Sequence, residues 1–278
     1  NIFYQAGILA GPLVGLLFMA VDFRLTAAAA AVVFALLTAA QLFALPQHDA
    51  EAPVDKTSVL QDWRTVAGNG SFLLFAVAMI GSYVLSFQVY LALPLHAARL
   101  APQYESALIA VMFAVSGVVA VTAQLRITRW FSQRWGSSRS LVVGMVLVGL
   151  AFAPLIAVPD GRFGSAAAIT ALLASTALLA IGSAAVFPFE MDTVVALSGG
   201  RLVGTHYGFY STIVGVGILA GNVGTGALMQ AADRRGLGVA VWVALAGIGL
   251  LSAAALRLLA RNGHLQPGSE QPVGADAR

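Results

Sequence analysis

Cysteine is absent from the 278-residue sequence, and lysine occurs once, at Lys56. Without cysteine the chain cannot form disulfide bonds, thiolate metal sites, iron–sulfur clusters or a cysteine nucleophile. A single lysine with no glycine-rich run before it excludes a P-loop for ATP. Charged residues make up only 10% of the chain, against roughly 25% in soluble domains. These shortages exclude an ordinary soluble fold. The sequence has no basic stripe with interleaved aromatic residues, so it does not indicate a nucleic-acid partner.

Apolar residues dominate instead, at 59% of the chain, which also excludes a disordered protein. A helix needs roughly 20 apolar residues to cross a hydrocarbon core about 30 Å thick. Eight stretches meet this requirement: Phe3–Val21, Leu25–Leu45, Phe72–Leu93, Ser106–Thr128, Ser140–Val158, Ser165–Phe187, Tyr207–Gln230 and Gly238–Ala260. None shows the alternating polarity of membrane strands. The predicted fold class is therefore all-α: a polytopic bundle of eight transmembrane helices in the lipid bilayer.

Basic residues are unevenly divided between the two sides of this bundle. The connections at 46–71, 126–139 and 190–206, together with the end of the last span from Arg257 and the segment after it, carry ten of the arginines and lysines, and the opposite side carries five. Because arginine and lysine are enriched in cytoplasmic loops, the first side is predicted to be cytoplasmic. We therefore expect a multi-pass protein of the cell membrane with both ends of this chain in the cytoplasm.

Two segments lack the apolar character of the spans. Residues 46–71 form the longest connection and contain seven charged or histidine side chains, so we expect a polar cytoplasmic linker. Residues 262–278 contain two prolines and three glycines without an apolar period, and we expect a disordered cytoplasmic tail.

A short sequence repeat relates the first and seventh predicted spans. Gly7-Ile8-Leu9-Ala10-Gly11 recurs as Gly217-Ile218-Leu219-Ala220-Gly221, 210 residues later. Six membrane helices with their loops need about 200 residues. The repeat therefore predicts two related units of six helices, of which the first shows only two helices in this chain.

The first span also carries a recognisable motif. Gly7-x-x-x-Gly11-Pro12-x-x-Gly15 resembles the fifth-helix signature of drug:proton antiporters in the major facilitator superfamily, although Leu16 replaces the last glycine of that signature. The segment 126–141 resembles the family's basic loop between paired helices, with Gln133 at the usual acidic position. The resemblance implies a twelve-helix fold of two pseudo-symmetric halves. It assigns residues 1–45 to the end of the first half, 46–71 to the central linker and 72–261 to the second half.

The motif also has a direct physical meaning. Gly7, Gly11 and Gly15 form a smooth stripe against which another helix can pack closely, and Pro12 bends the helix. In the family this contact is implied to seal one face of the transporter; simple helix packing is the alternative. Gly217 and Gly221 form the corresponding stripe in the seventh span.

Polar and aromatic residues within the spans are the candidates for a substrate site, because polar groups in hydrocarbon are costly. Tyr83, Phe87 and Tyr90 recur at helical spacing and could bind apolar or cationic compounds, since ring faces attract cations. Aromatic packing is the alternative. The amides that could contribute hydrogen bonds to the substrate, or merely between helices, are Gln88, Gln124 and Asn222.

Two carboxylates are the candidates for proton coupling. Glu190 and Asp192 follow the predicted sixth span, where partial burial would disfavour the charged form and allow proton exchange. A solvated interfacial pair near Arg201 is the alternative. Five spans, the third to fifth and the last two, contain no acidic residue, so we expect most coupling carboxylates in four preceding helices of the same protein.

These observations favour secondary transport over other functions. The four histidines are scattered, so neither a metal site nor a metalloprotease is predicted, and no G-x-S-x-G elbow is present. We expect no cofactor and no catalytic residues. The leading hypothesis is proton-coupled efflux of small apolar or cationic compounds by the whole protein, half of whose substrate cavity lies outside this chain. A sugar or metabolite transporter, or a membrane receptor or scaffold without transport, are the alternatives.

Overall fold

The computed structural model describes residues 23–44, 59–159 and 162–265. The chain separates into two compact units, residues 1–59 and 60–278, and the boundary falls inside the predicted linker. The first unit contributes one described helix, α2 (Phe23–Ala44), which agrees with the second predicted span. The second unit contains the remaining elements: α3 (Val59–Ala67), α4 (Gly70–Ser86), η1 (Phe87–Val89), α5 (Ala92–Leu100), η2 (Pro102–Tyr104), α6 (Glu105–Leu150), α7 (Ala153–Ala157), α8 (Ser165–Leu197), α9 (Val203–Arg235) and α10 (Gly238–Arg261).

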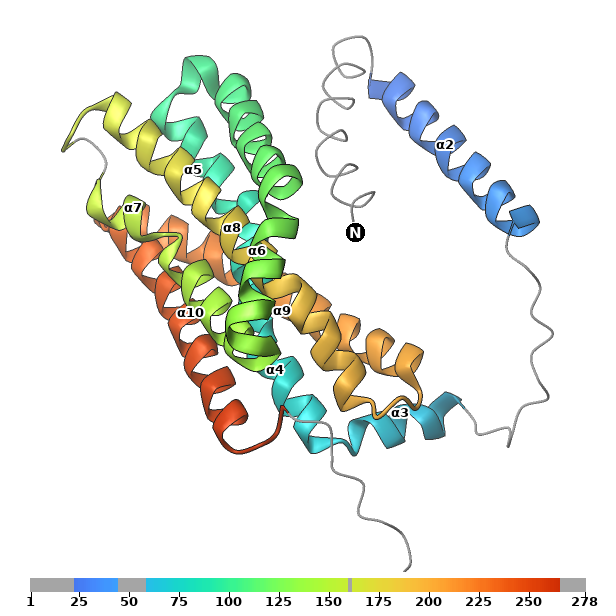
Figure 1. Cartoon of the computed structure of the whole chain (residues 1–278). Helices are drawn as coiled ribbons and strands as arrows, with labels where there is room; N and C mark the ends of the chain where they lie inside the picture. The colour runs from blue at the N-terminus through green and yellow to red at the C-terminus, as the bar shows by residue number, and fades with distance from the viewer. Residues whose placement is uncertain (1–22, 45–58, 160–161, 266–278) are drawn as a thin grey trace, which may run out of the picture. The chain divides into compact units, whose positions relative to one another are not determined.

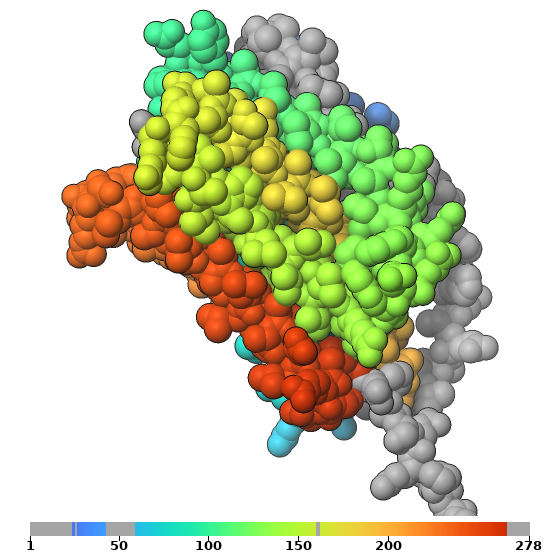
Figure 2. Space-filling model, turned by 60° about the vertical axis from the view of Figure 1, so that its left-hand side comes forward, coloured from blue at the N-terminus to red at the C-terminus, as the bar shows by residue number. Residues whose placement is uncertain are grey.

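The second unit is a bundle of long helices (Figure 1). α8 packs along α6, α10 packs against α6 and α4, and α9 packs against α4. Figure 2 shows α10, in red, directly against the green to yellow residues of α6 and α7. Within the described residues, five stretches are long and apolar enough to cross a membrane: 70–100, 102–157, 165–197, 203–235 and 238–261. The chain is a multi-pass, all-α membrane protein, as the sequence predicted.

The fourth and fifth predicted spans are joined almost without a loop. α6 has 46 residues, which would be about 69 Å long if straight. Its backbone breaks at Gly136 (φ 70°, ψ 177°), a left-handed conformation that favours glycine. The Ser140 hydroxyl donates to the Phe131 carbonyl at 3.2 Å, although nine residues of straight helix would span about 13 Å. The chain therefore reverses at Gly136, and the predicted loop at 126–139 is wrong because most of it is helical.

The third predicted span is longer than expected and is interrupted. It runs from Gly70 to Leu100, but its α-helix gives way to a 3₁₀ turn at Phe87–Val89, and a new helix starts at Ala92. Tyr83, Phe87 and Tyr90 consequently do not form one helical face, and the predicted continuous aromatic stripe is wrong.

Other boundaries also differ from prediction. α8 continues ten residues beyond the predicted end at Phe187, with Pro188 inside the helix. The predicted linker at 46–71 includes helix α3 and the start of α4, where Asn69 caps the helix by accepting a hydrogen bond from the Phe72 amide at 3.1 Å. The rest of that linker, the first predicted span and the tail beyond residue 265 lie outside the described residues.

Glycine allows the helices of this bundle to approach closely. A methyl group at Gly249 would lie 2.4 Å from the Gly149 Cα, so the backbones of α10 and α6 cross in direct contact. Methyl groups at Gly217 and Gly221 would lie 2.5 and 2.6 Å from the side chains of Ile80 and Val84, respectively. The small-residue stripe of the seventh predicted span thus packs α9 against α4. Gly7, Gly11, Pro12 and Gly15 lie outside the described residues, so the proposed equivalence of the two stripes stays a prediction.

Candidate functional site

A buried carboxyl lies where α4, α8 and α9 meet. Glu190 on α8 is 1% exposed, and it is the only buried acidic side chain among the described residues. The Tyr210 hydroxyl of α9 donates to Glu190 Oε1 at 2.5 Å, and Tyr83 of α4 is a further hydrogen-bonding partner of the same carboxyl. Three helices therefore contribute side chains to one polar cluster inside the bundle.

Aromatic rings enclose this cluster. The Tyr210 ring is stacked on Phe75 and meets the edge of Tyr83, with centroids 6.2 Å apart in both pairs. In the described part of the chain no ion pair involves Glu190. A negative charge here would be supported by phenol hydroxyls alone, and burying such a charge costs several kcal/mol more than burying the neutral acid.

The two predicted proton-coupling candidates occupy different environments. Asp192 is exposed on the outer face of α8, as expected for a carboxylate in contact with solvent, whereas Glu190 is enclosed. Their separation follows from helical geometry, because residues two apart point to different sides of a helix. Of these two carboxylates, only Glu190 is enclosed by protein.

Two of the predicted substrate-binding amides are brought together at the helix break. Gln88, in the 3₁₀ turn, is completely buried, and its Nε2 donates to the Val84 carbonyl at 2.6 Å. The same nitrogen lies 3.5 Å from Asn222 Oδ1 of α9. Because Nε2 must face the Val84 carbonyl, Oε1 is the remaining acceptor, and it has no hydrogen-bond partner among the described residues. The third amide, Gln124, is buried in α6 and also has interactions within the protein.

The predicted aromatic residues form a second, more exposed group. The Tyr90 ring lies 5.7 Å from both Phe87 and Phe113, measured between centroids, and Tyr90 is 54% exposed. Phe113 comes from α6 and was not singled out in the sequence. Tyr83 belongs instead to the Glu190 cluster, so the predicted aromatic set divides between two places.

Tyr210 is the site residue that sequence reasoning missed. The only signal for it is its position four residues after His206, which places both side chains on one face of α9. His206 is also buried: its Nδ1 lies 3.0 Å from the Leu202 carbonyl, and its Nε2 has no partner among the described residues. No group of three or more potential metal ligands occurs in the described ranges.

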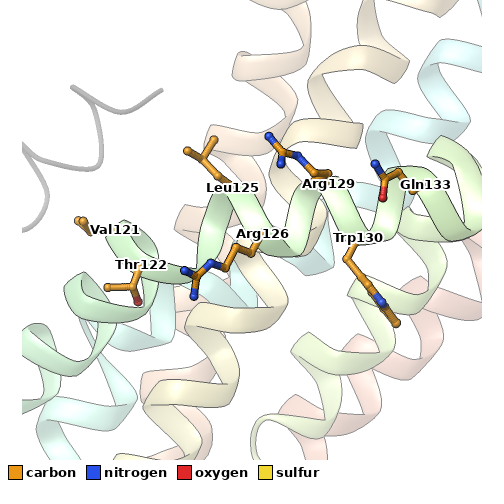
Figure 3. A pocket seen from close by; sticks show the side chains of 7 residues that line it. All are labelled: Val121, Thr122, Leu125, Arg126, Arg129, Trp130 and Gln133. Carbon is orange, nitrogen blue, oxygen red and sulfur yellow. The ribbon is translucent and has the colours of Figure 1, made fainter.

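A separate hollow of about 450 Å³ lies along one face of α6 (Figure 3). It contains none of the predicted substrate-binding residues. Its lining consists of Val121, Thr122, Leu125, Arg126, Arg129, Trp130 and Gln133.

Membrane-spanning helices packed through glycine around an enclosed carboxyl define a polytopic membrane protein with a polar site inside its helix bundle. The family model of the Major Facilitator Superfamily matches residues 1–221, and the chain belongs to this superfamily. The predicted membership of the major facilitator superfamily is thereby confirmed.

Curated relatives agree with this assignment. The chain is 60% identical over 260 residues to the uncharacterized MFS-type transporter Rv0849 of Mycobacterium tuberculosis, covering 93% of this chain and 62% of that protein. It is 27% identical over 252 residues to the multidrug resistance protein MdtH of Klebsiella pneumoniae, covering 91% of this chain and 60% of that protein. The chain thus spans about three fifths of the length of these relatives. Their names describe transporters and a resistance protein, not enzymes, in agreement with the prediction that the chain is not an enzyme.

Proposed function

We propose that the protein is a proton-coupled secondary transporter that exports small apolar or cationic compounds. The observation that carries this proposal is the enclosed Glu190 carboxyl, held between α8 and α9 by Tyr210. Membership of the superfamily and the likeness to a protein named for multidrug resistance support it.

Glu190 is suited to link proton binding to helix packing. When it is neutral, the carboxyl is compatible with the apolar surroundings; when it is charged, it depends on hydroxyl donors from α4 and α9. Any movement that separates α8 from α9 removes the Tyr210 donor and admits water, which changes the free energy of the charged form. Proton binding and helix arrangement therefore bias each other, which is the requirement for coupled transport.

The substrate is proposed to contact the aromatic group and the neighbouring amides. The exposed Tyr90 ring with Phe87 and Phe113 offers flat apolar surface that also attracts cations. Gln88 Oε1, which has no hydrogen-bond partner in the described part of the chain, can accept one hydrogen bond from a substrate hydroxyl or ammonium group. Asn222, half-buried beside it, is the second polar contact.

The experiment compares Glu190→Gln with Asp192→Asn in the full-length protein reconstituted into vesicles. An imposed pH gradient drives uptake or release of a fluorescent lipophilic cation, and proton flux is recorded with a pH-sensitive dye. We expect Glu190→Gln to reduce coupled proton flux at least severalfold and Asp192→Asn to leave it unchanged. Equal effects of the two substitutions would contradict the proposed role of Glu190. Complete loss of coupling in Glu190→Gln alone would show instead that this carboxyl is the main coupling site, against the expectation that most lie in preceding helices.

The Gln88–Asn222 pair favours a second candidate, a transporter specific for a hydroxyl-rich sugar or metabolite. In the same vesicles, exchange driven by a polyol but not by lipophilic cations would support that candidate. Absence of exchange with every solute class would favour a receptor or scaffold.

A further inference from the structure

His206 has a nitrogen inside the bundle that can bind a proton. The residue lies on the first turn of α9, is 5% exposed and meets the Phe72 ring of α4 edge to face at 4.9 Å. Its Nδ1 lies 3.0 Å from the Leu202 carbonyl, which is an acceptor only and therefore requires a proton on Nδ1. In the neutral imidazole, Nε2 is then the nitrogen without a proton.

The Nε2 atom is enclosed by the bundle itself. It is buried and has no hydrogen-bond partner among the described residues. Because it is enclosed, a soluble molecule or another part of the chain can reach it only when the helices around it move apart. A buried acceptor without a donor is costly, so its presence in a packed interior requires an explanation.

No charged side chain of the packed elements is bonded to this nitrogen. The charged groups on the helices and turns at this end of the bundle are, besides Glu190, Asp62, Arg64, Asp192, Arg201, Arg257 and Arg261. None of these six is buried. Two further titratable groups bond elsewhere: the Tyr207 hydroxyl donates to the Met191 carbonyl at 3.2 Å, and His264 Nδ1 lies 3.0 Å from the Ser71 hydroxyl.

His206 lies between the end of the bundle and the Glu190 cluster. It is three residues, or about 5 Å, from the start of α9 at Val203, whereas Glu190 is seven residues, or about 10 Å, from the end of α8 at Leu197. Only residues 198–202 join these two helix ends, so both lie on the same side of the membrane. A proton that enters from this side therefore passes the level of His206 before it reaches Glu190.

Tyr210 connects the two levels. It follows His206 by one turn on the same face of α9, and helical side chains lean toward the N-terminus of their helix. The Tyr210 ring therefore leans toward the turn that carries His206, and its hydroxyl donates to Glu190 Oε1 at 2.5 Å. A hydroxyl can donate one hydrogen bond and accept another, so it can pass a proton between two groups.

We infer that His206 passes protons between the aqueous phase and Glu190. This inference rests on the proposed proton-coupled function. When the helix ends around His206 part enough to admit water, Nε2 binds a proton from the aqueous phase. That proton then moves to the Tyr210 oxygen, directly or through one water, as the Tyr210 hydroxyl proton moves to the Glu190 carboxylate. His206 is left neutral and Glu190 is protonated, and the reverse sequence releases the proton.

The test measures coupled proton flux of the full-length protein in vesicles, with an imposed pH gradient, a fluorescent lipophilic cation and a pH-sensitive dye. His206→Asn keeps an amide donor for the Leu202 carbonyl but removes Nε2. We expect it to slow proton flux at least about threefold, because water alone must then deliver the proton. The control His264→Asn removes the histidine bonded to Ser71 at the same end and should change the flux by less than about twofold.

A double variant tests whether the two groups act in series. Adding His206→Asn to Glu190→Gln should cause no further loss of proton flux, because the path already lacks its destination. Independent, multiplying losses would contradict a common path. If His206→Asn melts below the wild-type protein, His206→Gln, which keeps an amide near the Nε2 position, takes its place in both comparisons.

Chemical rescue separates proton transfer from packing. In His206→Ala, added imidazole should restore proton flux, whereas pyrazole, a ring of the same size that stays neutral, should not. Equal restoration by both rings, or by neither, would overturn the inference.

The same vesicles distinguish failure of this inference from failure of the proposed function. Unchanged proton flux in His206→Asn beside a loss in Glu190→Gln would overturn the role of His206 and leave the proposed function intact. Unchanged flux in both variants would overturn both, because a proton passed by His206 would have no destination at Glu190.

Discussion

The crossing of α6 and α10 offers a direct test of the bundle. In Gly249→Ala, the added methyl group would lie 2.4 Å from the Gly149 Cα and 2.9 Å from the Gly149 nitrogen. Ordinary van der Waals contact begins at 3.4 Å, so the two backbones must separate by about 1 Å. Backbone atoms cannot turn away as a side chain can, and both helices must therefore shift.

Overpacking of this kind typically costs about 1–3 kcal/mol in a well-packed interior. In a domain of about this size, such a loss lowers the melting temperature by roughly 2–10 °C. Gly217→Ala should cost less, because its methyl group would meet the Ile80 side chain, which can change rotamer.

The measurement is thermal unfolding of the full-length protein in mild detergent, followed by tryptophan fluorescence. Trp242 is a suitable reporter because it lies on α10, is 4% exposed and stacks on Phe152. Gly247→Ala is the matched control: it lies on the same helix, and no atom comes within 4 Å of its added methyl group. We expect this control to melt at or above the wild-type temperature, since alanine favours helix over glycine.

A Gly249→Ala protein that melts at the wild-type temperature would refute the reasoning. So would equal destabilisation by Gly247→Ala, because the effect would then not arise from the crossing.

Two further predictions concern side-chain pairs. Tyr210→Phe removes the hydroxyl that donates to Glu190, and we expect the free energy of unfolding to fall by about 1–3 kcal/mol. The control, Tyr90→Phe, removes the hydroxyl of an exposed ring and should have little effect in the same thermal assay. Similar losses in both would argue against the buried hydrogen bond. Arg99 and Asp233 form an ion pair at 2.6 Å with side chains 46% and 44% exposed, so a double-mutant cycle with Arg99→Gln and Asp233→Asn should give a coupling below about 1 kcal/mol that decreases with salt. A larger coupling energy that does not depend on salt would contradict the conclusion that this ion pair is exposed to solvent.

Hydropathy predicted which parts of the described chain are helical and apolar, but not where the helices break. The run 70–100 is mostly apolar, and the 3₁₀ turn at Phe87–Val89 contains neither glycine nor proline, so the composition gives little signal for a break there. The opposite case occurs at Pro188: the predicted span stops one residue before this proline, although the helix continues through it. Whether a helix breaks or continues at such a position depends on whether neighbouring helices supply hydrogen-bond partners for its backbone groups. A single sequence does not record those partners.

The sequence predicted some individual residues of the candidate site, but not which of them lie together in the fold. Glu190 stands out in the sequence because it is an acidic residue among apolar ones. Its partners do not, since Tyr83 lies 107 positions before it and Tyr210 lies 20 positions after it. The amides Gln88 and Asn222 were candidates for the same reason as Glu190, and only the packing of α4 against α9 brings them together.

The reversal at Gly136 leaves the two spans that it connects with no slack. A flexible loop would let one span move along the membrane normal while its neighbour stayed in place. Here a single left-handed residue and the bond from Ser140 to Phe131 fix the vertical register of the two spans. The pair must therefore enter the bilayer as one hairpin, and afterwards it can tilt or translate only as a unit.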